Sequence, residues 1–230
     1  MIRIQNIQTL FIKQIKDFIK NTPILVLFLV YPIIAIMMTS AMGNQSGAGD
    51  FITIFATMHC VFSPAVSSAC ILAEEKEQNT LRLLIMSNVT LREYFISIGG
   101  FILIANLITG ASFLFLLHLD IASALVFMGS LALGSLISTI LGFCIGLFAK
   151  NASAANGLAV PFGMIFAFLP MLSSFNKGIE SVSRFTFGQQ ITYLLKNLRT
   201  DLLGVAVITS NLILLICLAT ILYRKSLTEE

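Results

Sequence analysis

Charged residues are scarce in this chain of 230 residues. Only 11% are Asp, Glu, Lys or Arg, whereas 57% are hydrophobic, and the mean hydropathy is +0.94. Soluble domains typically carry about 25% charged and roughly 45–50% apolar residues. The composition therefore excludes an ordinary soluble protein and predicts an integral membrane protein.

The residue patterns of common catalytic and metal sites are lacking as well. Cys60, Cys70, Cys144 and Cys217 all fall in apolar segments without a close pair at metal-ligand spacing, which favours small buried side chains. His59 and His118 stand alone, and no His, Asp or Glu follows His59 by three or four positions. We therefore expect no metal site and no catalytic residues.

Two further absences bear on the energy source of a membrane protein. The Gly-x-x-x-x-Gly-Lys-Ser/Thr phosphate loop does not occur, so the chain is not expected to bind ATP by that route. No apolar segment has a clear Asp or Glu near its middle. Proton- or sodium-driven carriers usually need such an intramembrane carboxylate, and its absence disfavours a secondary carrier.

Long apolar runs are the main positive feature of the sequence. A hydrocarbon core about 30 Å thick needs roughly 20 helical residues for each crossing. Six segments meet this length, at residues 23–42, 51–73, 94–117, 121–149, 152–175 and 202–223. The predicted fold is all-α, one polytopic transmembrane domain over residues 1–230, with a kink where Pro161 and Pro170 interrupt the fifth span.

The distribution of basic residues predicts the orientation. With the N-terminus inside, the cytoplasmic segments hold ten of the 14 Lys and Arg residues, as the positive-inside rule requires. Both termini are therefore expected in the cytoplasm and the chain in the plasma membrane. In residues 1–22, Ile4, Ile7, Phe11, Ile15 and Phe18 alternate with Lys13, Lys16 and Lys20, which predicts an amphipathic helix lying in the cytoplasmic interface.

The cytoplasmic loop at residues 74–93, AEEKEQNTLRLLIMSNVTLREY with its flanks, is unusually polar and ordered. Asn79 tolerates a left-handed turn and is expected to separate two helices. Leu81, Leu84 and Ile85 stand at i, i+3 and i+4, which predicts a short helix with one apolar face. Ser87 and Asn88 should end it, and Thr90 to Glu93 fits a capping box that starts the third span.

This loop resembles the first cytoplasmic loop of ABC-2 type exporter permeases. Glu75, Glu77, Thr80, Leu81 and Leu84 match the family pattern, whereas Asn79 replaces its glycine, Asn88 its proline and Arg82 an acidic residue. The resemblance implies a coupling helix from Asn79 to Ser87 that docks on a separate ATPase subunit. The residues so implicated are Glu75, Glu77, Asn79, Thr80, Leu81, Leu84 and Ile85.

The same resemblance implies the partners. An ATP-binding-cassette ATPase would carry ATP and Mg, no cofactor would bind this chain, and a second permease protomer would complete a homo- or heterodimer. The bilayer is the remaining partner, and no nucleic-acid partner is expected. The substrate would be amphipathic, such as a drug, a hydrophobic peptide or a lipid-like molecule, moved outward.

Three other patterns have a mechanical interpretation. Small residues four apart in the fourth span predict a close helix-packing face, formed by Ser130, Gly134, Ser138, Gly142 and Gly146. Residues 176–201 are predicted to form two short amphipathic helices at the outer surface, divided at Gly188. Polar residues inside spans are candidates either for a transport pathway or for interhelical hydrogen bonds: Asn106, Thr109, Asn156 and Asn211.

Other functions remain open from the sequence alone. An ATP-independent carrier or channel is the main alternative, and a membrane scaffold would leave the ordered loop unexplained. A charged loop could also be solvated without a partner. Glu74 and Glu75 resemble the paired glutamates of CAAX-type membrane proteases, but Asn79 stands where that family has an Arg and no histidine motif follows.

Overall fold

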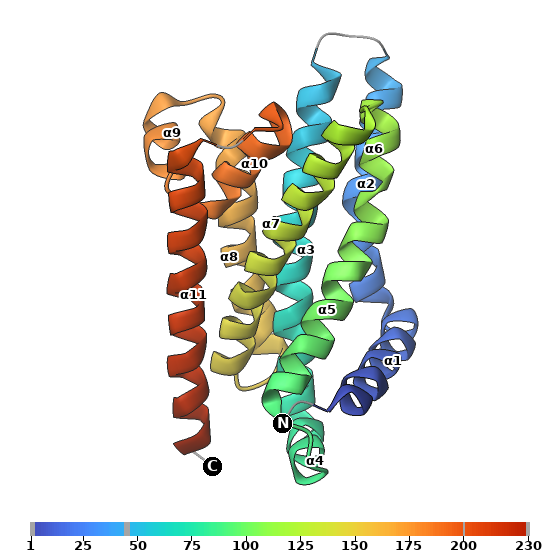
Figure 1. The fold of residues 1–230 in the computed structure, drawn as a ribbon, viewed down its shortest axis with the longest axis vertical. Coiled ribbons are helices and arrows are strands. Elements are labelled where there is room, and N and C mark those ends of the chain that lie inside the picture. The colour runs from blue at the N-terminus through green and yellow to red at the C-terminus, as the bar shows by residue number, and fades with distance from the viewer. Residues whose placement is uncertain (1–2, 44–46, 200, 229–230) are drawn as a thin grey trace.

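The computed structural model describes residues 3–43, 47–199 and 201–228, and all regular structure in these ranges is helical (Figure 1). The helices are α1 (Ile4–Lys20), α2 (Thr22–Met42), α3 (Ala48–Glu77), α4 (Thr80–Met86), α5 (Leu91–Gly110), α6 (Ser112–Leu117), α7 (Ile121–Phe148), α8 (Ala152–Ser173), α9 (Lys177–Ser183), α10 (Phe187–Asn197) and α11 (Leu202–Thr228). The long helices stand side by side in a bundle.

Among the described residues, six helical segments are long and apolar enough to cross a membrane. They are Thr22–Met42, Ala48–Glu77, Arg92–Leu117, Ile121–Phe148, Ala152–Ser173 and Leu202–Arg224. The third runs through α5 and α6, which join at Ala111, a residue that keeps right-handed helical φ and ψ angles. The all-α polytopic fold predicted from the sequence is confirmed.

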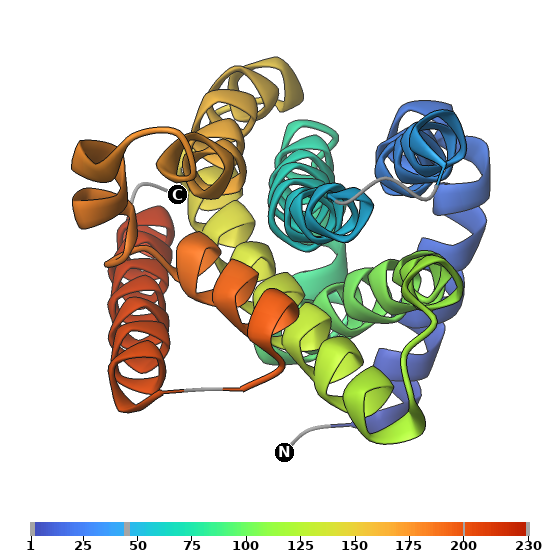
Figure 2. The ribbon, with the colours of Figure 1, turned by 90° about the horizontal axis from the view of Figure 1, so that it is seen from above.

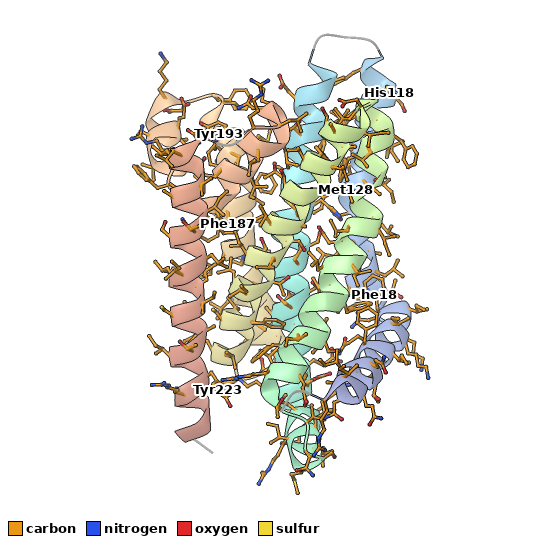
Figure 3. The ribbon with its side chains drawn as sticks, in the orientation of Figure 1. Phe18, His118, Met128, Phe187, Tyr193 and Tyr223 are labelled. Atoms are coloured by element: carbon orange, nitrogen blue, oxygen red, sulfur yellow. The ribbon has the colours of Figure 1, made fainter. Side chains whose placement is uncertain are left out.

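The short helices mark the two ends of the bundle. Helix α4 lies at one end of the bundle, which we call the α4 end, and the N and C marks lie in the same half of the bundle, which we call the α4 half (Figure 1). Helices α9 and α10 lie at the opposite end, which we call the α10 end. Helix α1 packs beside α5 at the α4 half, where the Phe18 ring meets that of Phe101 edge-on at 5.3 Å between centroids (Figure 3).

Helix α3 forms the centre of the molecule. It packs against α2, α5, α7, α8 and α10 (Figure 2). In the most apolar 18-residue stretch of α3, 83% is buried, whereas the corresponding share is 17–28% in the spans of α2, α5, α8 and α11. Most other helices therefore keep a broad apolar face for lipid or for another protein. The interior of a single chain is filled by α3 and the helices around it.

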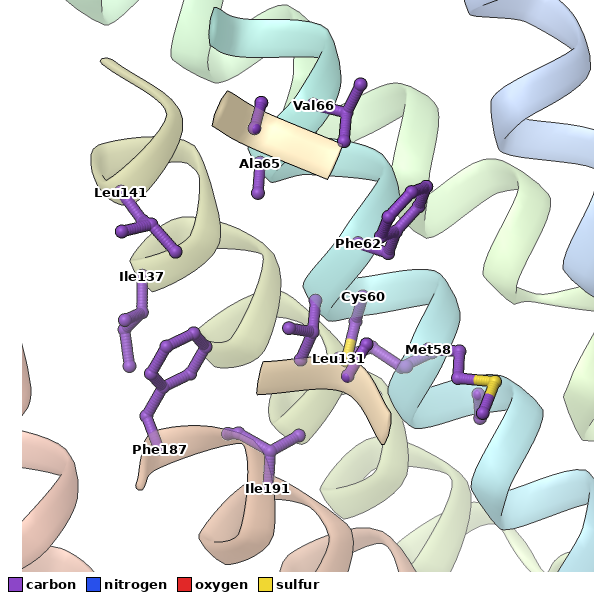
Figure 4. Close-up of a cluster of buried hydrophobic side chains, with 14 of the residues drawn as sticks. Met58, Cys60, Phe62, Ala65, Val66, Leu131, Ile137, Leu141, Phe187 and Ile191 are labelled. Atoms are coloured by element: carbon purple, nitrogen blue, oxygen red, sulfur yellow. The ribbon is translucent and has the colours of Figure 1, made fainter. Parts of the chain in front are cut away.

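The closest contact in the bundle joins α3 to α7. Apolar side chains of both helices belong to one buried core cluster, in which Ile137 of α7 lies beside Phe187 of α10 (Figure 4). A Cβ atom added at Gly142 would lie 1.9 Å from Ser68 Oγ and 2.2 Å from the Ala65 carbonyl oxygen. This position therefore accepts glycine alone, because any side chain would force the helices apart.

The other small residues of the α7 stripe follow the same seam. Ser130, Gly134, Ser138 and Gly146 are buried, and a Cβ atom at Gly134 or Gly146 would meet atoms of α3 at 2.8 or 2.9 Å. The partner of the stripe in this structure is therefore α3 of the same chain.

The segment between α8 and α11 differs in detail from the sequence prediction. Two short helices are present, but α9 and α10 separate at residues 184–186, and Gly188 lies inside α10. Gly188 is needed for packing instead, since a Cβ atom there would lie 2.2 Å from the Phe166 carbonyl oxygen. Phe187 and Ile191 are buried in the core, so α10 inserts between α3, α7 and α8 and does not lie only at the surface (Figure 4).

Candidate functional site

The polar segment after α3 forms a junction at the α4 end. Three consecutive residues, Glu75, Lys76 and Glu77, leave the end of α3 in different directions and each contacts a different part of the bundle. We call these three residues the anchoring triplet. Successive helical residues point about 100° apart, which is why one short stretch can reach three neighbours.

Glu75 connects α3 to the N-terminal helix. Its Oε1 accepts a hydrogen bond from Lys13 Nζ at 2.5 Å, in an ion pair, and another from Gln14 Nε2 at 3.3 Å. Glu75 is buried and Lys13 is about one-third exposed. Burial strengthens the attraction but also raises its desolvation cost, so the pair fixes the position of α1 more than it adds stability.

Lys76 caps the C-terminus of α7. Its Nζ donates to the carbonyl oxygens of Gly146, Leu147 and Ala149 at 3.2, 2.7 and 2.8 Å. The last carbonyls of a helix lack intrahelical partners and carry the negative end of the helix dipole. A lysine ammonium satisfies both requirements at once.

Glu77 caps the N-terminus of α8. Its Oε2 accepts a hydrogen bond from the backbone N–H of Ala152, the first residue of α8, at 2.9 Å. Asn151 caps the same end by accepting from Ala154 N at 2.8 Å. A carboxylate at a helix N-terminus is stabilised by the helix dipole. The anchoring triplet therefore ties α3 to α1, α7 and α8.

The turn into α4 has the predicted geometry. Asn79 is left-handed, with φ of 56°, and is followed at once by α4. Asn88 is left-handed as well, with φ of 63°, one residue after the C-cap Ser87. The substitutions of Asn for the family's Gly and Pro therefore still give a turn before and after the short helix.

Helix α4 has two different apolar faces. Leu81 and Leu84 are half-buried and pack on a hydrophobic cluster formed with α1, α2 and α5, and Thr80 is half-buried too. Leu83, Ile85 and Met86 are exposed at 61%, 42% and 73% of their surface. The outward face is therefore formed by Leu83, Ile85 and Met86, of which the sequence pattern identified only Ile85.

The entry to α5 completes the junction. Thr90 and Glu93 form the predicted capping box, with Thr90 N donating to Glu93 Oε2 at 2.8 Å and Glu93 N donating to Thr90 Oγ1 at 3.3 Å. The Glu93 carboxylate also accepts from the backbone N–H of Arg3 at 2.5 Å and from Asn6 Nδ2 at 3.1 Å. One side chain thus caps α5 and holds the start of α1.

The description "ABC-2 family transporter protein" fits this architecture, and the family model of that description matches residues 3–223. The chain belongs to this family. A search among curated proteins finds no match. Membership makes this ABC-2 family chain a membrane component of a transporter and implies association with an ATP-binding-cassette component.

The polar span residues of this ABC-2 family chain separate into two groups. Asn106 donates through Nδ2 to the His59 backbone carbonyl at 3.2 Å, and the Asn106 backbone carbonyl contacts His59 Nε2 at 3.0 Å. Thr109 Oγ1 contacts the same ring nitrogen at 3.1 Å. Asn211 donates to the Phe185 carbonyl at 3.0 Å. Asn106 and Thr109 therefore make interhelical contacts, the alternative that the sequence left open, and Asn211 joins α11 to the turn between α9 and α10.

Asn156 is the exception. It is exposed on α8, and the described residues give its side chain no hydrogen-bond partner. Unpaired amides are costly in hydrocarbon, so this residue is the one of the four that remains a candidate for lining a transport pathway.

The sequence analysis missed two contributions to the junction. Lys76 was counted only as a basic residue of the loop, because its three acceptors are carbonyls 70 to 73 positions away in the sequence. Leu83 and Met86 are three positions apart, the spacing of a second helical face. That spacing was visible in the sequence and could have identified the exposed face.

Proposed function

We propose that this chain is the permease subunit of an ATP-driven exporter and that α4 docks on a separate ATPase subunit. The observation that carries the proposal is the exposed apolar face of Leu83, Ile85 and Met86 on a helix held by the anchoring triplet. Exposed apolar patches of this kind on a polar segment are typical of protein contacts. Family membership supplies the class of partner.

The orientation follows from the same end of the molecule. Basic residues concentrate at the α4 end, including Lys13, Lys76, Arg82 and Arg92, and the positive-inside rule then puts α4 and both termini in the cytoplasm. In a plasma membrane, this is the side on which ATP is available to the partner ATPase. ATP and Mg would bind that partner and not this chain.

The second permease protomer is part of the proposal. Helix α3 fills the centre of one chain, whereas α8 keeps much exposed surface, with apolar side chains such as Phe162 and Ile165 and the unpaired Asn156. A pathway between two chains would be lined by an exposed helix of this kind. A mainly apolar lining suits an amphipathic substrate, such as a drug, a hydrophobic peptide or a lipid-like molecule, moved outward.

Docking by α4 is tested with charged substitutions on its outward face. Leu83→Asp and Met86→Asp should weaken co-purification with the ATPase roughly 30-fold or more, since an unpaired carboxylate at an interface costs at least about 2 kcal/mol. Substrate-stimulated ATP hydrolysis should fall in parallel. Ser181→Asp on α9 is the control, because it adds the same charge at an exposed position at the opposite end of the bundle.

The inward face distinguishes docking from folding. Leu81→Asp and Leu84→Asp place a charge against the hydrophobic cluster and should lower yield and thermal stability in addition to coupling. Normal ATPase association by Leu83→Asp and Met86→Asp would contradict the docking proposal. A chain that purifies alone and moves substrate without ATP would instead establish a carrier or channel.

A further inference from the structure

A groove of about 1050 Å³ opens beside the core in the α4 half of the bundle. Its floor is α7, from Leu136 to Leu147, and its walls are α5 and α11. Helix α11 packs chiefly on α7 and α10 and stands away from α5, as Figure 1 shows. Thr90 and Leu147 of the junction also line the groove, but no residue of α4 itself does.

Two adjacent glycines make the groove hollow. A Cβ atom at Gly100 would meet nothing within 4 Å, and one at Gly99 would meet side chains only at 3.7 Å or beyond. The hydroxyls of Thr139 and Thr220 in the lining are already bonded to carbonyls of their own helices, at 2.7 Å each. The groove therefore offers an apolar surface along which a hydrocarbon chain can lie.

The α4 end of the groove is positively charged. Arg92 and Arg224 both line it, both are exposed, and the described residues provide neither guanidinium with an ion pair or hydrogen bond. Arg92 lies in the first turn of α5, where the helix dipole disfavours positive charge. Helix stability therefore does not explain this arginine. Guanidinium groups bind phosphate oxygens in a bidentate manner.

The aromatic residue at this end fits a headgroup boundary. Tyr223 precedes Arg224 in the lining and lies near the α4 end of α11 (Figure 3). Tyrosine is enriched where the hydrocarbon of a membrane meets its headgroups. Apolar walls, an aromatic boundary and two arginines thus follow one another along the groove, in the order in which a phospholipid presents its chain, its glycerol and its phosphate.

We propose that this groove binds an anionic glycerophospholipid, with its phosphate at Arg92 and Arg224 and one acyl chain along Gly99 and Gly100. Anionic lipids are preferred over zwitterionic ones because the latter carry an ammonium group beside the phosphate, which the two arginines repel. The site goes beyond the proposed transport function and does not depend on it, since no ATPase contact is involved.

The chain offers a clean spectroscopic test because it contains no tryptophan. Leu103→Trp places a single reporter in the groove, and Ile104→Trp places one on the adjacent residue, which is 46% exposed and outside the lining. The two positions differ by only about 1.5 Å along the helix axis. The full chain is reconstituted in phosphatidylcholine vesicles with rising fractions of brominated phosphatidylglycerol or brominated phosphatidylcholine, which quench tryptophan on contact.

We expect brominated phosphatidylglycerol to quench the Leu103→Trp reporter at an about fivefold lower mole fraction than brominated phosphatidylcholine. The Ile104→Trp reporter should respond to both lipids alike. On the opposite wall, Ile216→Trp lines the groove and Leu218→Trp does not, so this pair repeats the comparison independently.

Charge variants test the headgroup site. Arg92→Gln and Arg224→Gln should remove the preference for phosphatidylglycerol at the Leu103→Trp reporter, whereas Lys150→Gln, which removes an exposed charge outside the groove, should retain it. Gly100→Leu should fill the hollow and reduce quenching by both lipids. Gly129→Leu, at another glycine with open space around it, should not.

Two results would overturn the proposal. Equal quenching of the groove reporters by both lipids would show ordinary boundary lipid without a headgroup site. Absence of quenching in the groove, with normal quenching at Ile104→Trp and Leu218→Trp, would show that protein covers the groove, as in contact with a second copy of the chain. Both results leave the docking of α4 unaffected, so the two proposals fail separately.

Discussion

At the residue scale, the junction depends on charged side chains that satisfy backbone groups at helix ends. Lys76 donates to the carbonyls at the end of α7, Glu77 accepts from an N–H at the start of α8, and Glu93 accepts from the N–H groups of the N-cap residues of α1 and α5. Sequence analysis correctly identified the capping box because its members are three positions apart. It could not identify the Lys76 contact, because the acceptors are defined only once α3 and α7 pack together.

Lys76→Met should destabilise the protein. The substitution keeps the aliphatic stem but removes the donor for three carbonyls, and unsatisfied buried polar groups cost about 1–3 kcal/mol. The fraction of chain that stays monodisperse in size-exclusion chromatography after heating measures the loss. Lys150→Met, at an exposed position, is the control, and equal thermal stability of the two variants would refute the capping role.

Glu93→Ala should release the N-terminal helix. The carboxylate accepts hydrogen bonds from Arg3 N and Asn6 Nδ2 as well as from Thr90 N, so its loss frees both helix ends. We expect hydrogen exchange to accelerate at least about tenfold in α1, since the lost contacts amount to roughly 1.4 kcal/mol or more. Glu180→Ala, on the distant α9, should leave α1 unchanged. Exchange in α1 that stays slow in Glu93→Ala would show that other contacts hold the helix.

At the element scale, the fold depends on how closely α3 and α7 approach. The spacing of small residues on α7 indicates a packing face, but a single sequence does not say which helix lies on it. The structure supplies that partner, and it also shows why α10 was only partly predictable: its apolar spacing fits an interfacial helix, whereas Phe187 and Ile191 insert into the core. Periodicity identifies an apolar face and not what covers it.

Gly142→Ala should therefore be strongly destabilising. The new methyl group would overlap Ser68 Oγ and the Ala65 carbonyl, and overpacking of a core costs typically about 1–3 kcal/mol or more. Thermal unfolding in detergent measures the change. Gly129→Ala on the same helix has open space around it and should be neutral, so similar stability of both variants would show that the helices separate without cost.

At the scale of the whole molecule, composition and apolar run length were sufficient to predict six spans, because the bilayer sets the length of each. The positions of the short helices at opposite ends were predictable for the same reason, since they alternate with spans. What sequence could not supply is the depth at which each helix is buried. Run length does not distinguish the central α3 from the peripheral α11, and mean hydropathy does not rank burial either: the α8 span, at 1.7, is less apolar than the α7 span, at 2.2, yet more exposed.

The proposed orientation is tested by labelling from outside the cell. In a background without the four native cysteines, Ser181→Cys on α9 should react with a membrane-impermeant maleimide in intact cells. Ser87→Cys at the end of α4 should react only after permeabilisation, because the two exposed positions lie at opposite ends of the bundle. The reverse pattern would invert the topology and place α4 out of reach of a cytoplasmic ATPase.

The Lys76 contact has a consequence for how this protein can change over evolutionary time. Its acceptors are main-chain oxygens, and every amino acid carries the same carbonyl group. So far as this contact is concerned, Leu147 and Ala149 can mutate freely, while the lysine cannot. The joint between α3 and α7 is therefore robust to sequence drift on one side and constrained on the other, and a family member from a distant lineage could keep it with one residue alone.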